Sequence, residues 1–446
     1  MRLRPLAISA ASALALMGAS GVPAHADGLP DLGHQVLPAN DGWASSTTGT
    51  TGGSAADDAH VFTVTNRSEL IQALGGDNKK NATNATPKII QVQGTIDGNV
   101  DDANQPLSCA NYADPAFTLD AYLAQFDPAV WGKQPVAGPL EDARKRSEST
   151  QAARVQIRVG PNTTIVGLGR DATMLGVNLL IQNVDNVIVR NVDFENAFDC
   201  FPAWDPNDGA TGNWNSQFDN ITVKGTTHLW VDHASFTDGA MPDSSSPTFF
   251  GRPFEQHDGE LDITNASDLA TVSWNAFREH DKTMLIGSSD STTADTGKLR
   301  VTLHHNHFEN VGQRAPRVRY GQVHVYNNYY VIPDGGNYSY SWGVGQQPLP
   351  VANGIYAEHN YFRTGARLTP DRMISAFTGG RSIYVAGTLQ TATATDMPIE
   401  PLVSYNAARD PDLSNSVGWT PTVYREFDST SAVTHVVQLH AGPFKW

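Results

Sequence analysis

A short unit made of asparagine, any residue and an aromatic residue recurs along the chain, and it limits the fold more than any other feature. The four units are Asn275-Ala276-Phe277, Asn306-His307-Phe308, Asn328-Tyr329-Tyr330 and Asn360-Tyr361-Phe362. Their asparagines stand 31, 22 and 32 residues apart. A period of about 22 with inserted loops predicts a coil of parallel β rungs. Asparagines at the same turn of each rung can hydrogen-bond in a ladder, with the aromatic residues stacked inside.

Short β-branched runs bounded by turn residues accompany the repeat. They are Val155–Val159, Thr164–Val166, Val187–Val189, Ile221–Val223, Leu229–Val231, Ala270–Ser273, Leu299–Leu303, Val323–Val325 and Ile355–Ala357. No long amphipathic helix separates them, which argues against alternating strands and helices. A β-sandwich also contains many short strands and is the alternative. The recurring register of the repeat favours a solenoid, so we predict an all-β parallel β-helix.

The segments before the repeat are predicted to decorate this coil. Residues 27–60 are rich in Gly, Ser, Thr and Asp and predict an irregular lead-in. Ser68–Leu74, followed by two glycines, predicts a short helix that caps the N-terminal rung. Residues 101–150 are polar and weakly periodic, and we expect a large loop or helical excursion there.

The first residues have the pattern of a secretory signal peptide. Two arginines precede the apolar stretch Leu6–Ala19, and Ala24-His25-Ala26 follows it. We therefore expect residues 1–26 to be removed and residues 27–446 to form a single secreted, extracellular domain. The apolar stretch is shorter than the roughly 20 residues of a membrane helix. No later segment is long and apolar enough to cross a bilayer, so no membrane partner is expected.

The composition argues against two further classes of protein and allows a disulfide. The 446 residues include 30 Lys+Arg and 46 Asp+Glu, a formal net charge of −16, which argues against nucleic-acid binding. The 40% of hydrophobic residues excludes an intrinsically disordered chain. An oxidising destination allows a disulfide between Cys109 and Cys200. Two buried free thiols are the alternative, because sequence alone does not place the two cysteines together.

One cluster of candidate site residues is acidic. It comprises Asp219 and the segment Asp258-Gly259-Glu260-Leu261-Asp262. Carboxylate oxygens are ligands for hard cations such as Ca²⁺. Asp258 and Asp262 would stand roughly 13 Å apart on a straight strand, so a shared ion requires a bend at Gly259. A solvated acidic loop is the alternative, since no complete calcium-loop motif is present.

A second cluster is basic and a third is rich in histidine. Arg314, Arg317 and Arg319 lie close in sequence, with Lys282 upstream. Guanidinium groups match carboxylates with two parallel hydrogen bonds, but solvent-exposed arginines paired to local acids are the alternative. The third cluster consists of His304, His305 and His307. We favour packing of these side chains within the rungs over a zinc site. A zinc site requires three or four placed ligands.

Together these residues resemble the pectate lyases of polysaccharide lyase family 1. Four segments carry the resemblance in family order across about residues 155–365. They are Leu229-Trp230-Val231-Asp232-His233; Asp258 to Asp262 followed by Thr271-Val272-Ser273-Trp274-Asn275; Lys282 with Leu285-Ile286-Gly287-Ser288-Ser289; and Arg314-Ala315-Pro316-Arg317-Val318-Arg319 with Gly321 and His324-Val325-Tyr326-Asn327-Asn328. The remaining segments resemble the family only loosely.

The resemblance implies a right-handed parallel β-helix with a substrate groove beside one sheet. It further implies a monomer that cleaves polygalacturonate, a (1→4)-α-D-galacturonan, by Ca²⁺-dependent β-elimination. The roles it implies are calcium ligands Asp219, Asp258 and Asp262; a catalytic base, Arg314; substrate-carboxylate ligands Lys282 and Arg319; a groove position for Arg317; and structural supports Asp232 and His233.

This chemistry suits the residue types, apart from an arginine base. Calcium and Lys282 would stabilise the charge that develops when the proton on C5 leaves. Arginine is normally always protonated, so an alkaline optimum is expected if Arg314 is the base. The rivals are a pectin lyase acting on methyl-esterified polymer, a polygalacturonase-type hydrolase and a non-catalytic polysaccharide-binding β-helix. Asp258 and Asp262 argue against the first, and no hydrolase motif set is evident for the second.

Overall fold

The computed structural model describes residues 31–392 and 395–445. The predicted signal peptide, residues 1–26, lies outside the described residues. Within the described part of the chain, no helix has the length and apolar character required to cross a membrane.

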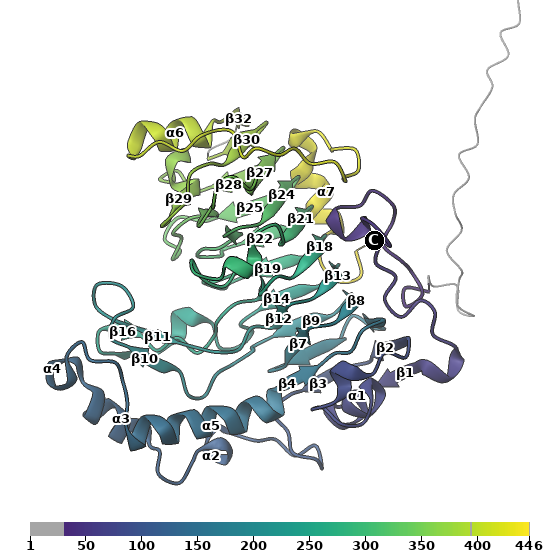
Figure 1. The fold of residues 1–446 in the computed structure, drawn as a ribbon, viewed down its shortest axis with the longest axis vertical. Helices are drawn as coiled ribbons and strands as arrows, with labels where there is room; N and C mark the ends of the chain where they lie inside the picture. Colours follow the sequence, from purple (N-terminus) through teal and green to yellow (C-terminus); the bar gives the residue numbers. More distant parts are fainter. Residues whose placement is uncertain (1–30, 393–394, 446) are drawn as a thin grey trace, which may run out of the picture.

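Most of the chain forms three parallel sheets that stack strand upon strand (Figure 1). Sheet 1 contains β4 (Gln156–Arg158), β7 (Asn178–Gln182), β12 (Ile221–Lys224), β17 (Leu261–Thr264), β20 (Leu285–Ile286), β23 (Arg317–Val318), β26 (Trp342–Val344) and β29 (Ile374–Ala376). Sheet 2 contains β1 (Val61–Val64), β2 (Lys88–Val92), β5 (Thr163–Gly167), β8 (Asp185–Arg190), β13 (Thr227–Asp232), β18 (Asp268–Ser273), β21 (Arg300–His304), β24 (Gln322–Tyr326), β27 (Gly354–Glu358) and β30 (Tyr384–Ala386). Sheet 3 contains β3 (Thr95–Asp97), β6 (Thr173–Leu175), β9 (Asp193–Glu195), β14 (Ser235–Thr237), β19 (Ala276–Arg278), β22 (His307–Glu309), β25 (Tyr329–Ile332), β28 (Tyr361–Thr364), β31 (Leu389–Thr391) and β32 (Met397–Pro398).

From β4 to β31 each rung takes one strand from each sheet, in the order sheet 1, sheet 2, sheet 3, and β32 pairs antiparallel with β31. The chain runs through β12, β13 and β14, and the next rung through β17, β18 and β19 pairs with them in parallel register. Crossovers between parallel strands are right-handed. The chain is thus a right-handed parallel β-helix, which confirms the predicted fold class.

The repeated unit forms the interior, as the sequence predicts. The four asparagines Asn275, Asn306, Asn328 and Asn360 are completely buried. The side-chain N–H of each of the first three donates to the amide oxygen of the next, at 3.0, 3.0 and 3.1 Å. The aromatic residues stack beside this ladder with ring centroids 4.4–5.2 Å apart, in the order Phe194, Phe236, Phe277, Phe308, Tyr330 and Phe362.

Helices close the two ends of the stack. The predicted capping helix is α1 (Arg67–Leu74), which begins after the Asn66 cap and buries Leu70 and Leu74 in the core. At the other end α6 (Pro401–Ala408) lies over the last strands, and α7 (Val433–His440) packs against the side of the stack (Figure 1). Between these caps the apolar core runs continuously through the β-helix.

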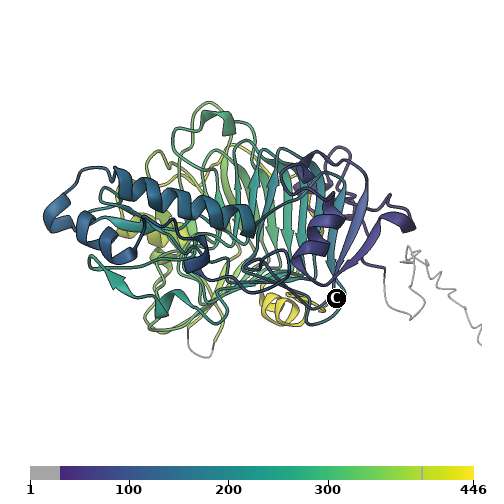
Figure 2. The same cartoon turned by 90° about the horizontal axis from the view of Figure 1, so that it is seen from below.

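The excursion at 101–150 is helical. It comprises α2 (Cys109–Tyr112), α3 (Leu119–Phe126), α4 (Pro128–Trp131) and α5 (Pro139–Val155). These helices extend to one side of the stack (Figure 2). They share a small aromatic core with the hairpins β10 (Ala203–Asp205) to β11 (Asn213–Asn215) and β15 (Thr248–Phe249) to β16 (Arg252–Pro253). A Cys109–Cys200 disulfide joins the excursion to the loop after β9, which decides between the two alternatives for the thiols.

One sequence expectation needs correction. The run Val155–Val159 is not one strand, because α5 extends through Val155 and β4 is limited to Gln156–Arg158. The first strands of the β-helix, β1 and β2, lie ahead of the motif region 155–365 but inside the predicted domain, residues 27–446. These early rungs lack the asparagine unit, so the repeat could not reveal them. Residues 31–60 are irregular, as predicted, and contain two short 3-10 helices, Trp43–Ser45 and Asp58–His60.

Candidate active site

The predicted acidic and basic clusters meet where the loops from sheet 3 enter sheet 1. Gly259 pairs with Lys282 through a single parallel bridge, and Lys282 pairs with Gln313 through another on the next rung. Asp258 and Arg314, the neighbours of the outer two residues, are thereby brought to either side of Lys282. Each segment lies just ahead of a strand of sheet 1 (β17, β20 and β23). Residues far apart in sequence therefore share one edge of one sheet.

Asp219, Asp258 and Asp262, called here the aspartate group, gather around Gly259. Asp219 Oδ1 accepts the backbone N–H of Gly259 at 2.9 Å, and Asp262 Oδ1 accepts the backbone N–H of Leu285 at 2.8 Å. A Cβ on Gly259 would stand 2.7 Å from Asp262 Oδ1 and 2.9 Å from Asp219 Oδ1. Since β17 begins only after Glu260, Asp258 and Asp262 do not share one straight strand. Gly259 itself pairs with Lys282, and the backbone bends at Glu260, one residue after the predicted position.

The aspartate group carries more negative charge than its surroundings balance. Burial, followed by repulsion from Asp258, raises the pKa of Asp219 to about 6. Burial and then Asp219 and Asp258 raise the pKa of Asp262 well above its usual value, against an opposing effect of Arg314. Converging carboxylates with raised pKa values fit a hard divalent cation, which prefers oxygen ligands and removes their repulsion.

Lys282 is buried beside this group. Its Nζ lies 2.6 Å from Glu255 Oε2 and 3.8 Å from Asp258 Oδ1. Burial works to lower the pKa of Lys282, but Asp258 and then Glu255 outweigh it and raise that pKa above its usual value. Lys282 therefore stays charged at neutral and moderately alkaline pH, as a ligand for a substrate carboxylate must.

Arg314 lies among the same carboxylates. Its φ of 60° is in the left-handed region, which non-glycine residues seldom adopt outside sites where the surroundings hold them there. Burial works to lower the pKa of Arg314, while Asp258 and Asp262 raise it above the usual value. Among the described residues its buried Nε has no hydrogen-bond partner. Arg314 therefore lies among the carboxylates of the aspartate group with one donor, Nε, still available.

The other two arginines differ in how firmly they are held. Arg319 donates from Nε to Asp290 Oδ1 at 2.7 Å and from Nη1 to the carbonyl of Gly287 at 2.9 Å. Arg317 lies over the ring of Phe377, 3.8 Å from its centroid. Burial, followed by Arg319, lowers the pKa of Arg317 to about 10. All three predicted arginines thus lie along sheet 1, and their individual roles stay predictions.

Comparison with known proteins identifies the family. The family model for pectate lyase matches residues 24–116 and 138–397. The chain is 48% identical to a pectate lyase of Bacillus subtilis over 418 residues, which cover 93% of this chain and 94% of that protein. The chain belongs to the pectate lyase family. It is therefore an enzyme, a polysaccharide lyase, as the motifs predicted.

Solved structures agree with this assignment. The structure of a thermostable pectate lyase superposes with a TM-score of 0.90 at 50% identity and covers 93% of this chain and 100% of that one. A pectate lyase bound to a hexasaccharide superposes with a TM-score of 0.87 at 47% identity, covering 93% of this chain and 99% of that one.

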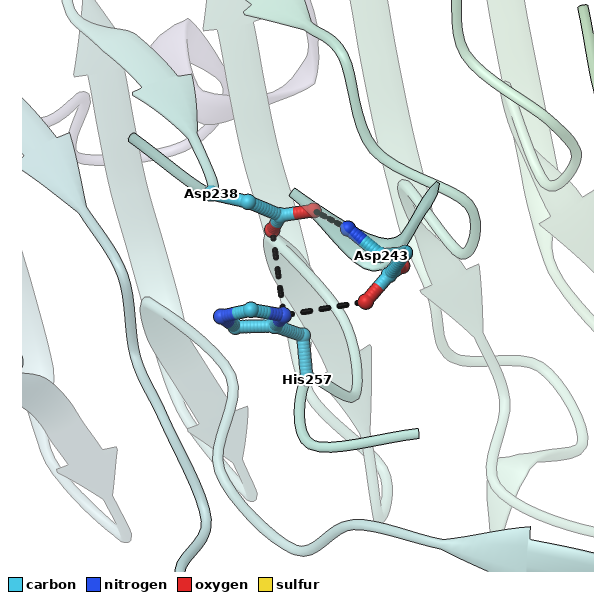
Figure 3. Close-up of side chains that lie close together, drawn as sticks. All are labelled: Asp238, Asp243 and His257. Atoms are coloured by element: carbon cyan, nitrogen blue, oxygen red, sulfur yellow. Dashed lines mark hydrogen bonds and ion pairs between the residues drawn. The ribbon is translucent and has the colours of Figure 1, made fainter. Parts of the chain in front are cut away.

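A second group of acids and histidines lies close to the active-site edge of this pectate lyase. Asp238, Asp243 and His257 each offer a ligand atom within 4.8 Å of the others. Figure 3 shows both carboxylates directed at His257, whose Nδ1 lies 2.9 Å from Asp243 Oδ1 and 3.6 Å from Asp238 Oδ1. His257 Nε2 lies 2.9 Å from the amide oxygen of Asn196. These three side chains offer enough ligand atoms for a metal ion, but the His257 ring already interacts with both carboxylates.

The histidines of the 304–307 run pack within the rungs, as predicted. His305 stacks on Trp274 at 4.2 Å between ring centroids, and His307 stacks on Tyr329 at 5.1 Å. Asp232, on sheet 2, accepts hydrogen bonds from Arg190 Nη2 and Ser273 Oγ, which fits the predicted structural support. The metal-ligand group found among the described residues includes none of these histidines.

Three residues near this site were not found from the sequence. Glu255 pairs with Lys282 and lines a hollow of about 530 Å³ beside the site, together with Asp243, Asp281 and His280. Asp238 and His280 form a buried ion pair at 2.8 Å. Burial works to lower the pKa of His280, but Asp238 and Glu260 outweigh it and raise that pKa well above its usual value. Each is an isolated residue in a loop, and only the rung register brings it to the site.

Proposed function

We propose that this pectate lyase is a secreted, monomeric enzyme that cleaves polygalacturonate by Ca²⁺-dependent β-elimination and leaves 4,5-unsaturated oligogalacturonides. The observation that carries the proposal is the placement of Asp258, Lys282 and Arg314 on successive rungs, within reach of one substrate residue. The hexasaccharide complex of the relative supports a groove that holds several sugar residues.

The aspartate group would hold the calcium ion. When bound, Ca²⁺ would offset the crowded carboxylates and supply positive charge toward the uronate carboxylate, as hard cations do at developing anions. Gly259 leaves the space between Asp219 and Asp262 free of a side chain. Any side chain at this position would fill the space in which those oxygens meet.

The protein's own residues would carry out the elimination. Lys282 and Arg319 bind the substrate carboxylate and stabilise the negative charge that develops beside C5. Arg314 accepts the proton from C5, the electron pair of that C–H bond forms the C4–C5 double bond, and the C4–O bond breaks. The departing oxygen keeps the bonding pair and takes a proton from water. No oxidant or reductant is required.

The base step depends on Arg314 being neutral for a moment. Asp258 and Asp262 favour its charged form by holding its pKa above the usual value. A cation that neutralises these two carboxylates would therefore lower the pKa of Arg314. Activation of the base would then depend on whether the aspartate group holds a cation. An alkaline optimum follows, because the rate rises with the neutral fraction of Arg314.

Ultraviolet absorbance during incubation of residues 27–446 with polygalacturonate tests the proposal. A Ca²⁺-dependent rise that chelator abolishes would reveal unsaturated ends. New reducing ends without absorbance would mean hydrolysis and would overturn the proposal. A rise only with methyl-esterified polymer would favour the pectin lyase alternative. Secretion is tested by mass spectrometry of the protein in the culture medium, where we expect an N-terminus at residue 27. The monomeric state is tested by light scattering.

A further inference from the structure

His280 occupies a position that none of the roles above explains. It is buried, and both ring nitrogens have close polar neighbours. Nδ1 lies 2.8 Å from Asp238 Oδ1. Nε2 lies 2.9 Å from the backbone carbonyl of Asp258 and 3.2 Å from that of Lys282. One ring thus contacts the main chain of a predicted calcium ligand and of a predicted substrate ligand.

The rung register explains how this contact arises. Thr237, the last residue of β14, pairs with Arg278, the last residue of β19. The chain leaves both strands at the same edge, so Asp238 and His280 emerge side by side on neighbouring rungs. From there His280 points back at the entry to sheet 1, where Asp258 precedes β17 and Lys282 precedes β20.

The partners determine what the ring can do. Carbonyl oxygens only accept hydrogen bonds, so Nε2 must donate to those of Asp258 and Lys282. A carboxylate likewise accepts, so Nδ1 donates to Asp238. The imidazole therefore acts as a rigid double donor between an anchored acid and two backbone carbonyls. Asp238 is itself held, because its Oδ2 accepts the backbone N–H of Asp243 at 3.3 Å.

We propose that His280, anchored by Asp238, is a positioning residue that clamps the backbone of Asp258 to that of Lys282 across neighbouring rungs. The clamp fixes the distance between the carboxylate that would bind calcium and the ammonium that would bind the uronate. Within the clamp Asp258 Oδ1 and Lys282 Nζ stand 3.8 Å apart. The inference rests on the proposed function for the roles of those two side chains.

The alternative hypothesis is that His280 only fills buried space. A hydrogen-bonding role and a packing role differ in which substitution should preserve function. A glutamine carries an amide N–H near the place of the histidine Nε2, so His280→Gln keeps a donor toward the two carbonyls. His280→Leu fills space without a donor. If packing alone mattered, leucine would serve as well as glutamine.

The test compares these variants with one matched control. His324 is also buried and also paired with a carboxylate, since its Nε2 lies 2.9 Å from Glu358 Oε1, but it belongs to sheet 2. His324→Leu therefore removes a similar buried pair away from the clamp. Calorimetry with CaCl₂ gives the Kd for Ca²⁺, and the absorbance assay on polygalacturonate gives kcat and KM.

We expect His280→Leu to weaken Ca²⁺ binding and to lower kcat/KM by roughly 10- to 100-fold, the range seen when outer partners of metal ligands are removed. His280→Gln should recover most of both. Asp238→Asn keeps the shape of the anchor and should shift both quantities in the same direction, and it serves if the leucine variant does not fold. The control should keep the wild-type Ca²⁺ affinity.

Two results would overturn the inference. One is a His280→Leu protein whose Ca²⁺ affinity and kcat match those of His324→Leu. The other is equal loss in His280→Gln and His280→Leu. Failure of the proposed function would show separately, as wild-type protein without Ca²⁺ binding or without unsaturated product, and the inference would fall with it.

Discussion

The asparagine ladder and the aspartate group both bring polar side chains of neighbouring rungs together, but they are built in opposite ways. In the ladder, the amide N–H of Asn275, Asn306 and Asn328 reaches the amide oxygen of the next asparagine. In the aspartate group, acceptors face acceptors and the pKa values of two carboxylates rise. A buried network whose donors and acceptors are matched stabilises a fold, whereas crowded carboxylates repel one another and would be stabilised by a bound cation.

The largest effect that separates the two regions is expected at Arg314. Arg314→Ala should lower kcat on polygalacturonate by roughly 10²–10⁴-fold, the usual contribution of a general base. The free energy of unfolding of this variant in Ca²⁺ should stay within about 1 kcal/mol of wild type, because the bound cation would compensate Asp258 and Asp262, the carboxylates that Arg314 faces. Arg317→Ala is the control, since Arg317 rests on Phe377. Equal losses of kcat in both variants would contradict the assignment of the base.

The ladder should show the converse, a loss of stability without loss of turnover per folded molecule. Asn328→Ala removes an amide that bonds to its neighbours above and below, and leaves the backbone N–H of Asn306 without its 2.9 Å acceptor. Leaving buried groups without partners costs about 1–3 kcal/mol each. Denaturant unfolding should therefore show a loss of about 3 kcal/mol.

Asn360 provides the control for this ladder prediction. It accepts the backbone and side-chain N–H of Asn328, as Asn328 accepts those of Asn306, but it donates to no further ladder asparagine among the described residues. Asn360→Ala should therefore cost less by about one hydrogen bond. A larger loss at Asn360 than at Asn328 would show that the ladder does not act as a continuous network.

Substitution of a buried residue usually destabilises a protein, but Asp219→Asn should stabilise this one when chelator is present. The pKa of Asp219 is raised from 3.8 to about 6, so the folded state holds the proton more tightly than the unfolded state does. The stability from this group is complete below pH 3.8 and is lost as the pH rises to about 6. In chelator above pH 6, the asparagine variant should be more stable than wild type by about 1–3 kcal/mol.

Two further measurements complete the Asp219 prediction. The gain should vanish near pH 4, where the wild-type carboxyl is protonated. With added Ca²⁺ the order should reverse, since only wild type would keep all three carboxylates. Thermal unfolding at pH 4 and pH 8, each with chelator and with Ca²⁺, checks all four conditions. A variant less stable than wild type in chelator at pH 8 would refute the account of crowded charge.

The same contrast explains what could be predicted from the sequence. The ladder is a one-dimensional repeat, so Asn275, Asn306, Asn328 and Asn360 reveal the rungs directly. The site residues Asp258, Lys282 and Arg314 were found as clusters and as family motifs, but their meeting at sheet 1 depends on rung register. No sequence motif singles out His280. Two of its partners are backbone carbonyls, which any sequence supplies, and the third, Asp238, lies 42 residues away in the chain.

The smallest effect is expected at Glu255, a partner that only the structure reveals. Its Oε2 lies 2.6 Å from Lys282 Nζ, so it competes with the substrate carboxylate for the same ammonium. Glu255→Gln keeps the shape but removes the competing charge, and Asp258 still holds the pKa of Lys282 up. We expect KM for polygalacturonate to fall about threefold, within the range of a weak ion pair, with kcat unchanged. Glu279→Gln is the control, because Glu279 lines the same hollow but accepts a hydrogen bond from Asn310 and not from Lys282. A fall in kcat with KM unchanged would instead mean that Glu255 holds Lys282 in place.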